Sequence, residues 1–262
     1  MDIGKVVTSA SQGIGSTAIG ERWVNKHPEG YHKGTYSETM QPHSECYFYD
    51  DFWNGLNIYA AGPPVTGTWT RQITGAAPPT VNAVAGACGW VENAFTNADQ
   101  KQEAGLYWSD KRTWAIAYGL QFEAKCVATV LPTLESEMWI GVGGDYAEGT
   151  IVTDGPAEHA FFVLDGSGAV VIYTDDTVND NNAIATGVTL TAGVGACFRI
   201  DFTDPASVKF YINGVRVAAG TIFNMNQVPA LVLQPYLWVH KESGEGVGTL
   251  ATDYVRLWQE RY

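Results

Sequence analysis

Apolar and polar residues alternate in short runs along most of the chain, and this period of two is typical of β-strands with one buried face. The clearest run is ACFRIDF, in which Phe198, Ile200 and Phe202 share a face and polar residues lie between them. An Asp-Pro turn leads into a second run, VKFYI, and Asn213-Gly214 then favours the positive φ angles of a type I′ turn. Residues 196–217 therefore predict a meander of three antiparallel strands.

Similar runs recur through the chain. The longest, at 114–130, places Gln121, Glu123 and Lys125 on one face and small or apolar residues on the other. Residues 94–110 are predominantly polar, and we expect no strand there. The pattern predicts an all-β fold, with about a dozen short strands in two stacked antiparallel sheets. The remaining expected strands lie at 46–53, 67–73, 81–91, 138–143, 159–164, 169–174 and 231–239.

The first part of the chain has a different composition. Residues 1–45 are rich in Gly, Ser, Thr and His, with a short helix-like segment at 16–25. We expect an extended N-terminal arm at 1–45 and one sandwich domain at 46–262. Some of the arm's residues are too apolar for a solvated tail, so we expect them to dock it on another protein or another copy of the chain. These residues are Ile14, Ile19, Trp23 and Val24.

Charge and composition exclude several classes of partner. The 262-residue chain is 45% hydrophobic, enough for a sizeable core, and its 12% aromatic residues and 29 glycines favour strands and turns. Its formal net charge of −13 does not provide the basic surface that DNA, RNA or an anionic membrane requires. Because no apolar run is long enough for a signal peptide or a membrane span, we expect synthesis and folding in a cytoplasm.

The cysteines do not suggest a metal site. They are widely separated, form no C-x-x-C pair and have no clustered histidines beside them, so we expect no zinc and no other cofactor. Two of them lie inside strand-like runs, where reduced, buried thiols are the expected state. The four are Cys46, Cys88, Cys126 and Cys197.

Two motifs near the C-terminus resemble a known superfamily. VKFYING at 208–214 is similar to the x-V-x-F-Y-x-N-G hairpin of concanavalin A-like, or laminin-G-like, jelly-roll domains, and TDYVRLWQ at 252–259 resembles their closing strand. CYFYDDFW at 46–53 resembles the opening of such domains in bacteriophage structural proteins. The resemblance implies a two-sheet jelly-roll sandwich, and it specifies the fold better than the activity.

An acid pair is the first candidate for catalysis. Glu135 and Glu137 would share a face of a strand, and retaining glycosidases use two carboxylates at about 5 Å. Glycosidases of the resembled fold carry an E-x-D-x-x-E strand, whereas no third acid follows Glu137 here. We therefore interpret the pair as a solvated strand edge and assign no catalytic residues.

Other polar residues are weaker candidates. The loop TDDTVNDNN at 174–182 could hold calcium, but it lacks the spacing of a known calcium loop, so we expect a hairpin tip built from Asx turns. His159 and His240 have no partner visible in the sequence and are interpreted as strand-end residues. We assign no metal-binding residues.

Exposed tryptophans could stack on sugar rings or contact another protein. Trp69, Trp90 and Trp108 border predicted loops, which makes them the candidates for a carbohydrate or protein interface. Three others lie inside strand patterns and are expected in the core: Trp139, Trp238 and Trp258.

Three functions fit these features. We favour a non-enzymatic bacteriophage virion protein, a capsid decoration or minor capsid protein whose arm docks on the major capsid protein or another virion protein. It would be made in the host cytoplasm, reside in the virion and form a homo-oligomer, a trimer from capsid geometry. The alternative is a lectin-like module that binds a surface glycan for host attachment, with exposed aromatic residues on a concave sheet and calcium-dependent stability. A glycan depolymerase would need an acid pair that the sequence does not provide.

Overall fold

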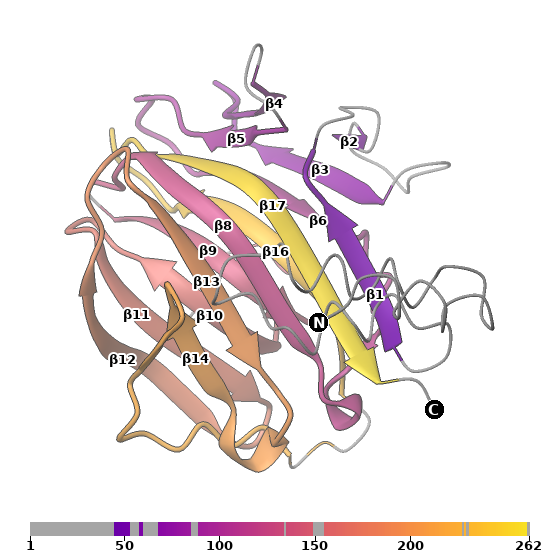
Figure 1. Ribbon diagram of the computed structural model, residues 1–262. Helices are drawn as coiled ribbons and strands as arrows, with labels where there is room; N and C mark the ends of the chain where they lie inside the picture. Colours follow the sequence, from indigo (N-terminus) through magenta and orange to yellow (C-terminus); the bar gives the residue numbers. More distant parts are fainter. Residues whose placement is uncertain are drawn as a thin grey trace, which may run out of the picture.

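The computed structural model describes residues 45–52, 58–59, 68–84, 89–133, 135–148, 155–226, 228 and 231–260. This part of the chain forms two sheets that stack face to face, with only two short 3₁₀ segments (Figure 1). No helix in it is long and apolar enough to cross a membrane. The expected arm, its helix-like segment and its four docking residues lie outside the described residues.

One sheet contains both ends of the described chain. Its order is β15-β14-β13-β8-β17-β5-β4, and β1 also pairs with β17. The last strand, β17, thus lies at the centre of the sheet, between β8 and β5. The eight strands are β1 (Glu45–Asp50), β4 (Thr80–Ala83), β5 (Val91–Ala94), β8 (Gln121–Val130), β13 (Gly195–Asp201), β14 (Lys209–Ile212), β15 (Val215–Val217) and β17 (Thr249–Glu260).

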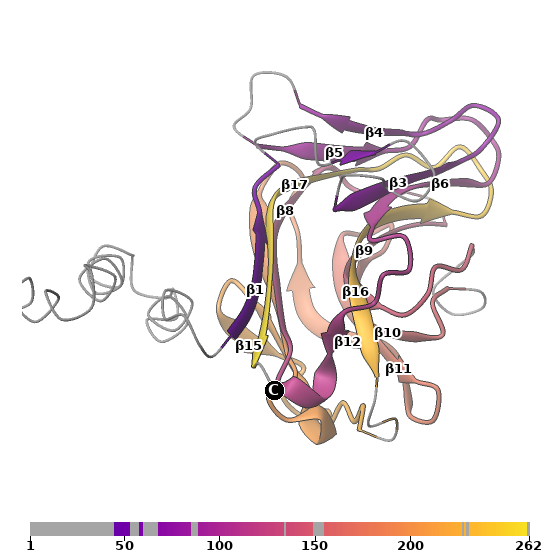
Figure 2. The same ribbon diagram turned by 90° about the vertical axis from the view of Figure 1, so that its right-hand side faces the viewer.

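The second sheet has the order β12-β11-β10-β9-β16-β6-β3-β2, and β7 also pairs with β16. All its pairings are antiparallel except that of β2 with β3. Figure 2 shows the two layers from the side, with β1, β17 and β8 in one and β16, β10 and β11 in the other. The nine strands are β2 (Ile58–Tyr59), β3 (Trp69–Thr74), β6 (Gln102–Tyr107), β7 (Trp114–Ala115), β9 (Ser136–Gly143), β10 (Glu158–Leu164), β11 (Ala169–Asp176), β12 (Asp180–Thr189) and β16 (Val232–Lys241).

The main hydrophobic core fills the space between the sheets. Phe162 of β10 meets Phe198 of β13 and Phe210 of β14 across this space, with ring centroids 5.1 and 5.2 Å apart. Asn213 and Gly214 have φ angles of 51° and 77°, as a type I′ turn between β14 and β15 requires. The all-β sandwich and its C-terminal meander are therefore confirmed.

Some expected strands differ from the structure. The run at 114–130 is broken by a 3₁₀ turn at Ile116–Tyr118, after which Gly119 adopts a φ of 66° and β8 begins. No strand was expected where β6 lies, because its two polar residues, Gln102 and Glu103, resemble a loop sequence. Both are completely buried, so their tertiary partners decide their conformation. The edge strand β12 was missed because nearly every side chain in it reaches solvent.

Candidate functional site

The outer face of the nine-stranded sheet, which points away from the other sheet, is aromatic instead of polar. On β9, Met138 and Ile140 point into the main core, so Trp139 between them points outward. Trp139 lies directly opposite Trp238 of β16 in the register of the two strands. A second hydrophobic cluster forms around this pair, and we call it the aromatic floor. It consists of Tyr107, Trp139, Phe161, Val163, Tyr173, Tyr236 and Trp238.

Glycines make room for these large rings. A Cβ atom at Gly105 of β6 would lie 2.0 Å from Cε3 of Trp238, and one at Gly143 would lie 3.0 Å from Cζ of Phe161. Both glycines occupy outward-facing positions of their strands, where the rings lie across the backbone. The spacing of glycine and aromatic residues therefore builds the floor, because a larger residue at Gly105 would displace the indole.

The loop after β9 lies over part of the floor. Tyr146 packs on Tyr107 and Trp238 with ring centroids 5.4 and 5.3 Å apart. The seven floor residues are at most 9% exposed. The rings therefore support the surface above them and are not themselves open for stacking.

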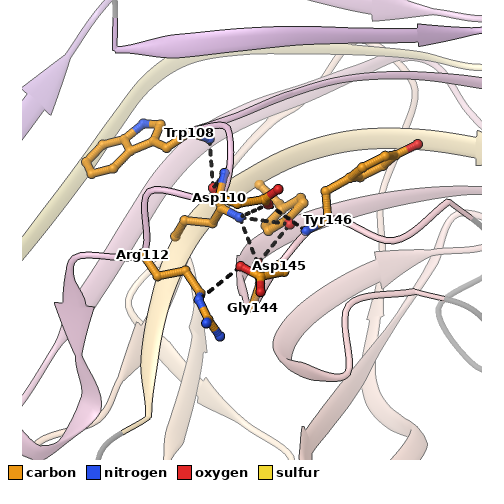
Figure 3. Close-up of polar contacts among 8 residues, drawn as sticks. Trp108, Asp110, Arg112, Gly144, Asp145 and Tyr146 are labelled. Carbon is orange, nitrogen blue, oxygen red and sulfur yellow. Dashed lines mark hydrogen bonds and ion pairs between the residues drawn. The ribbon is translucent and has the colours of Figure 1, made fainter. Parts of the chain in front are cut away.

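Gln234 of β16 holds this loop in place, together with Asp110, which Figure 3 shows beside Gly144 and Tyr146. Its side-chain oxygen accepts hydrogen bonds from the main-chain N–H groups of Trp108 (3.0 Å) and Asp110 (3.1 Å). Its Nε2 donates to the main-chain oxygen of Gly144 at 2.8 Å. Asp110 Oδ1 in turn accepts from the main-chain N–H of Tyr146 at 2.7 Å. Because Gln234 is buried, these bonds fix where Tyr146 enters the site.

A polar group lies at one end of the aromatic floor. Glu103 of β6 accepts a hydrogen bond from the Tyr146 hydroxyl at 2.7 Å, and its other oxygen lies 2.9 Å from Nδ1 of His240. The His240 ring stacks on Trp139 at 5.7 Å. We call this group, with the charged residues beside it, the polar rim. It comprises Lys101, Glu103, Glu137, Tyr146, Glu148, His240 and Glu242.

The inner part of the polar rim is buried and the outer part is exposed. Glu103 and His240 are buried, and a buried carboxylate is tolerated only when hydrogen bonds satisfy it. Lys101 lies 3.3 Å from Glu148 and 3.7 Å from Glu242, and these side chains are 31%, 48% and 57% exposed. A ligand can thus reach the outer three groups directly.

Electrostatics keep the donors of the rim protonated. Burial and the contact with Glu103 raise the pKa of Tyr146, so its hydroxyl is a donor at neutral pH. Burial alone would lower the pKa of Lys101, but the contact with Glu148 and the nearby acids outweigh it and raise this pKa. Trp139 Nε1 donates to Glu137 at 2.8 Å. The rim therefore presents carboxylates and one ammonium group, which can hydrogen-bond to hydroxyl groups.

The structure places the three predicted interface tryptophans differently. Trp69 is 0% and Trp108 is 8% exposed, and both rings pack edge to face against Phe48 in the main core. Trp69 Nε1 also donates to Asp50 at 3.0 Å. The expectation that Trp69 and Trp108 lie at a surface was wrong, because Trp69 begins strand β3 and both side chains pack into the main core. Trp90 is half-buried, and its role stays a prediction.

The three tryptophans expected in the core are buried, but none lies in the main core. Trp139 and Trp238 belong to the aromatic floor. Trp258 of β17 lies on the outer face of the other sheet, with the guanidinium of Arg256 5.1 Å from its ring centroid. Strand alternation shows which residues share a face of a sheet. It does not show whether that face points into the main core, because both outer faces of this protein also carry buried rings.

The structure also shows where the polar candidates of the sequence lie and what they contact. Glu135 precedes β9 with a φ of 55° and accepts from Ser243, so it does not share a strand face with Glu137. His240 does have a partner, Glu103, which is 137 residues away in the chain and was invisible in the sequence. Nδ1 of His159 lies 2.8 Å from the Pro156 carbonyl oxygen.

The Asp- and Asn-rich loop joins β11 to β12. Asp176 Oδ1 accepts from the main-chain N–H groups of Val178 and Asn179 at 3.0 and 2.6 Å, which confirms Asx turns at this tip. Among the described residues, no group of three or more His, Cys, Asp or Glu side chains is arranged to hold a metal ion.

Comparisons with known proteins identify the fold class. No protein-family model matches the chain, and no curated protein sequence matches it significantly. The structure is similar to a protein of unknown function, SO2946 from Shewanella oneidensis MR-1, with a TM-score of 0.52 and 11% identity over 83% of this chain and 87% of that chain. Two further similar structures belong to proteins with a stated role, and their similarity to this chain bears on its fold.

The first of these is the carbohydrate recognition domain of Emp47p, with a TM-score of 0.51 and 9% identity over 80% of this chain and 94% of that chain. The second is alginate lyase A1-II′, a member of polysaccharide lyase family 7, with a TM-score of 0.50 and 12% identity over 72% of this chain and 86% of that chain. Both have concanavalin A-like jelly-roll folds, so the expected fold class is confirmed. The bacteriophage part of the resemblance stays a prediction.

These comparisons correct one expectation. The sequence led us to expect a protein without enzymatic activity, because the glycosidase acid motif is missing. A polysaccharide lyase has the same fold, so the missing motif does not exclude an enzyme and the expectation was wrong. At 12% identity the likeness shows the fold alone, and enzymatic activity is not shown.

Proposed function

We propose that this protein binds carbohydrate through the polar rim on the outer face of its nine-stranded sheet. The observation that carries the proposal is the solvent-accessible triad of Lys101, Glu148 and Glu242 at one end of the closely packed aromatic floor. Rigid support lowers the conformational entropy that polar side chains lose when they bind a ligand. The similarity to the Emp47p carbohydrate recognition domain supports a carbohydrate ligand over other polar ligands.

The charge of the polar rim narrows the class of sugar. The polar rim contains four carboxylates but only two basic groups, the ammonium of Lys101 and the imidazole of His240. The carboxylates belong to Glu103, Glu137, Glu148 and Glu242. An anionic polysaccharide would meet like charges, which weakens association. Neutral glycans instead offer hydroxyl donors to the carboxylates. The ligand we expect is therefore a neutral glycan.

A glycan array tests the proposal, with the double variant Glu148→Gln, Glu242→Gln as the informative protein. Each substitution replaces a charged carboxylate acceptor by a neutral amide, which forms a weaker hydrogen bond to a sugar hydroxyl. Together the two substitutions should weaken glycan binding about tenfold. Glu260→Gln is the matched control, because Glu260 is exposed at the end of β17 in the other sheet. The proposal fails if the wild-type protein binds no glycan, or if the double variant binds as tightly as the control.

A second candidate, glycan cleavage, has its own observation. The Tyr146 hydroxyl, the Glu103 carboxylate and the His240 imidazole form one hydrogen-bonded chain, which is a common arrangement for proton transfer. Incubation with neutral and uronate polysaccharides would reveal new reducing ends, or the ultraviolet absorbance of unsaturated products. Product formation that is lost in Tyr146→Phe would support cleavage, and no product from any polysaccharide would reject it.

The role on a virus particle rests on the sequence alone. Capsid decoration, docking through the arm, a trimeric state and a virion location remain predictions, since the arm lies outside the described residues. Deleting residues 1–40 should leave a folded β protein by circular dichroism and abolish incorporation into particles. Normal incorporation of the shortened chain would reject the docking role of the arm.

A further inference from the structure

Lys241, the last residue of β16, carries a buried ammonium group among main-chain oxygens. Its Nζ lies 2.9 Å from the carbonyl oxygen of Thr96, 2.8 Å from that of Ala98, 3.0 Å from that of Gly244 and 2.9 Å from that of Gly246. We call these four oxygens the carbonyl cage. The side chain is completely buried, so no bulk water competes for the charge.

The carbonyl cage is unusual for a lysine. An ammonium group has three N–H donors, whereas four oxygens surround it at nearly equal distances. Lys241 forms no ion pair with any described carboxylate, and the ring of Phe95 lies 5.8 Å from Nζ. Burial lowers the pKa of Lys241, and the charges of Asp99 and Glu245 oppose this effect. Oriented carbonyl dipoles thus hold the charge, as they hold a monovalent ion in a selectivity filter.

The cage ties together two loops that support the polar rim. Thr96 and Ala98 lie in the loop before β6, which carries Lys101, and the two glycines lie in the loop after β16, which carries Glu242. A second bond joins these loops, from the main-chain N–H of Gly244 to Asp99 Oδ1 at 2.8 Å. Without a cation, four carbonyl oxygens would face one another and the loops would repel.

We propose that the carbonyl cage is a monovalent cation site whose resident cation is the tethered ammonium of Lys241. The distances of 2.8–3.0 Å exceed the 2.3–2.6 Å typical of Ca²⁺ and the 2.0–2.1 Å of Mg²⁺, so the cage fits larger cations such as K⁺ and NH₄⁺. The wild-type protein then needs no dissolved ion to order these loops. Removal of the side chain should open the cage to K⁺ or NH₄⁺.

Thermal unfolding of Lys241→Ala tests the proposal. Scans are run in KCl, NH₄Cl, LiCl and choline chloride at one ionic strength. The variant should melt below the wild type in choline chloride and recover about 3–6 °C in KCl or NH₄Cl, when the ion exceeds its dissociation constant about tenfold. The wild type should respond equally to all four salts. If the variant is insoluble, its refolding yield from urea in KCl against choline chloride gives the same comparison.

Lys125→Ala is the matched control, because the ammonium of Lys125 is partly exposed and pairs with Asp253 at 2.6 Å instead of with carbonyl groups. It should show no preference among the salts. Equal melting of Lys241→Ala in KCl and choline chloride would overturn the proposal, as would an equal KCl response of Lys125→Ala.

A second measurement rests on the proposed carbohydrate binding. Glycan binding by the wild type should be equally tight in KCl and in choline chloride, and binding by Lys241→Ala should require K⁺. Binding by the wild type that requires K⁺ would contradict a built-in cation. If no glycan binds at all, only the proposed function fails, since the thermal experiment does not depend on a ligand.

Discussion

Gly105→Ala is the sharpest test of how the aromatic floor is built. The added Cβ would lie 2.0, 2.4 and 2.7 Å from Cε3, Cδ2 and Cζ3 of Trp238, whereas carbon atoms in contact normally sit about 3.5–4.0 Å apart. The indole would have to move by about 1.5 Å to restore a normal contact. It cannot move freely, because Tyr146 packs on it at a centroid distance of 5.3 Å and Tyr236 at 5.8 Å.

The magnitude follows from two opposing effects. Overpacking a filled site costs about 1–3 kcal/mol, and Ala in a strand gains about 0.5–1 kcal/mol over Gly. Gly105→Ala should therefore lower the free energy of unfolding by about 1–2 kcal/mol. For a protein of this size that corresponds to a drop of about 2–8 °C in Tm, which differential scanning calorimetry and urea titration both measure.

Two further variants separate the clash from other effects. Gly195→Ala in β13 is the matched control, since a Cβ there would be no closer than 3.4 Å to another atom, and its stability should be unchanged or slightly higher. Trp238→Leu removes the clashing atoms, and Trp238 Nε1 has no hydrogen-bond partner in the described structure to lose. In that background Gly105→Ala should cost nothing. If Gly105→Ala alone is as stable as the wild type, the floor is not packed as described.

Three other outcomes are expected. Burial raises the pKa of Cys126 and Cys197 to about 12, so peptide mapping should find neither thiol alkylated by iodoacetamide at neutral pH before unfolding; rapid labelling of the native protein would contradict this. Burial lowers the pKa of His159, so below about pH 6.5 the unfolded state binds more protons than the folded state, and the folded state becomes less stable as the pH falls. The Tm of His159→Gln should therefore drop less than that of the wild type between about pH 7 and pH 5. Glu123→Gln removes the charge 2.8 Å from the buried Arg256 guanidinium and should cost about 3 kcal/mol in urea titrations, and a loss below 1 kcal/mol would show that the pair is not stabilising.

The strands were largely predictable because burial repeats every second residue. Phe198, Ile200 and Phe202 point into the core as their spacing requires, and Asn213-Gly214 forms the expected turn. The failures have a common cause. β6 begins with two polar residues and β12 begins with three, and partners from other strands or the edge position of the strand decide their structure.

The candidate site could not be read from the chain in the same way. Glu103 and His240 are 137 residues apart, and only the pairing of β6 with β16 brings them together. In the sequence, Lys241 cannot be told from an ordinary surface lysine. Its neighbours in the chain do not show that two loops direct four carbonyl groups toward its ammonium.

Local chemistry by itself therefore determined the all-β class, the turn after β14 and most of the main core, because alternation and turn propensity act between neighbours. Tertiary structure alone decided that Trp139 and Trp238 face outward onto glycines, and that Glu103, Tyr146 and His240 meet at their edge. The physical reason is that the choice of face and of polar partner depends on strand register, which couples residues far apart in the chain.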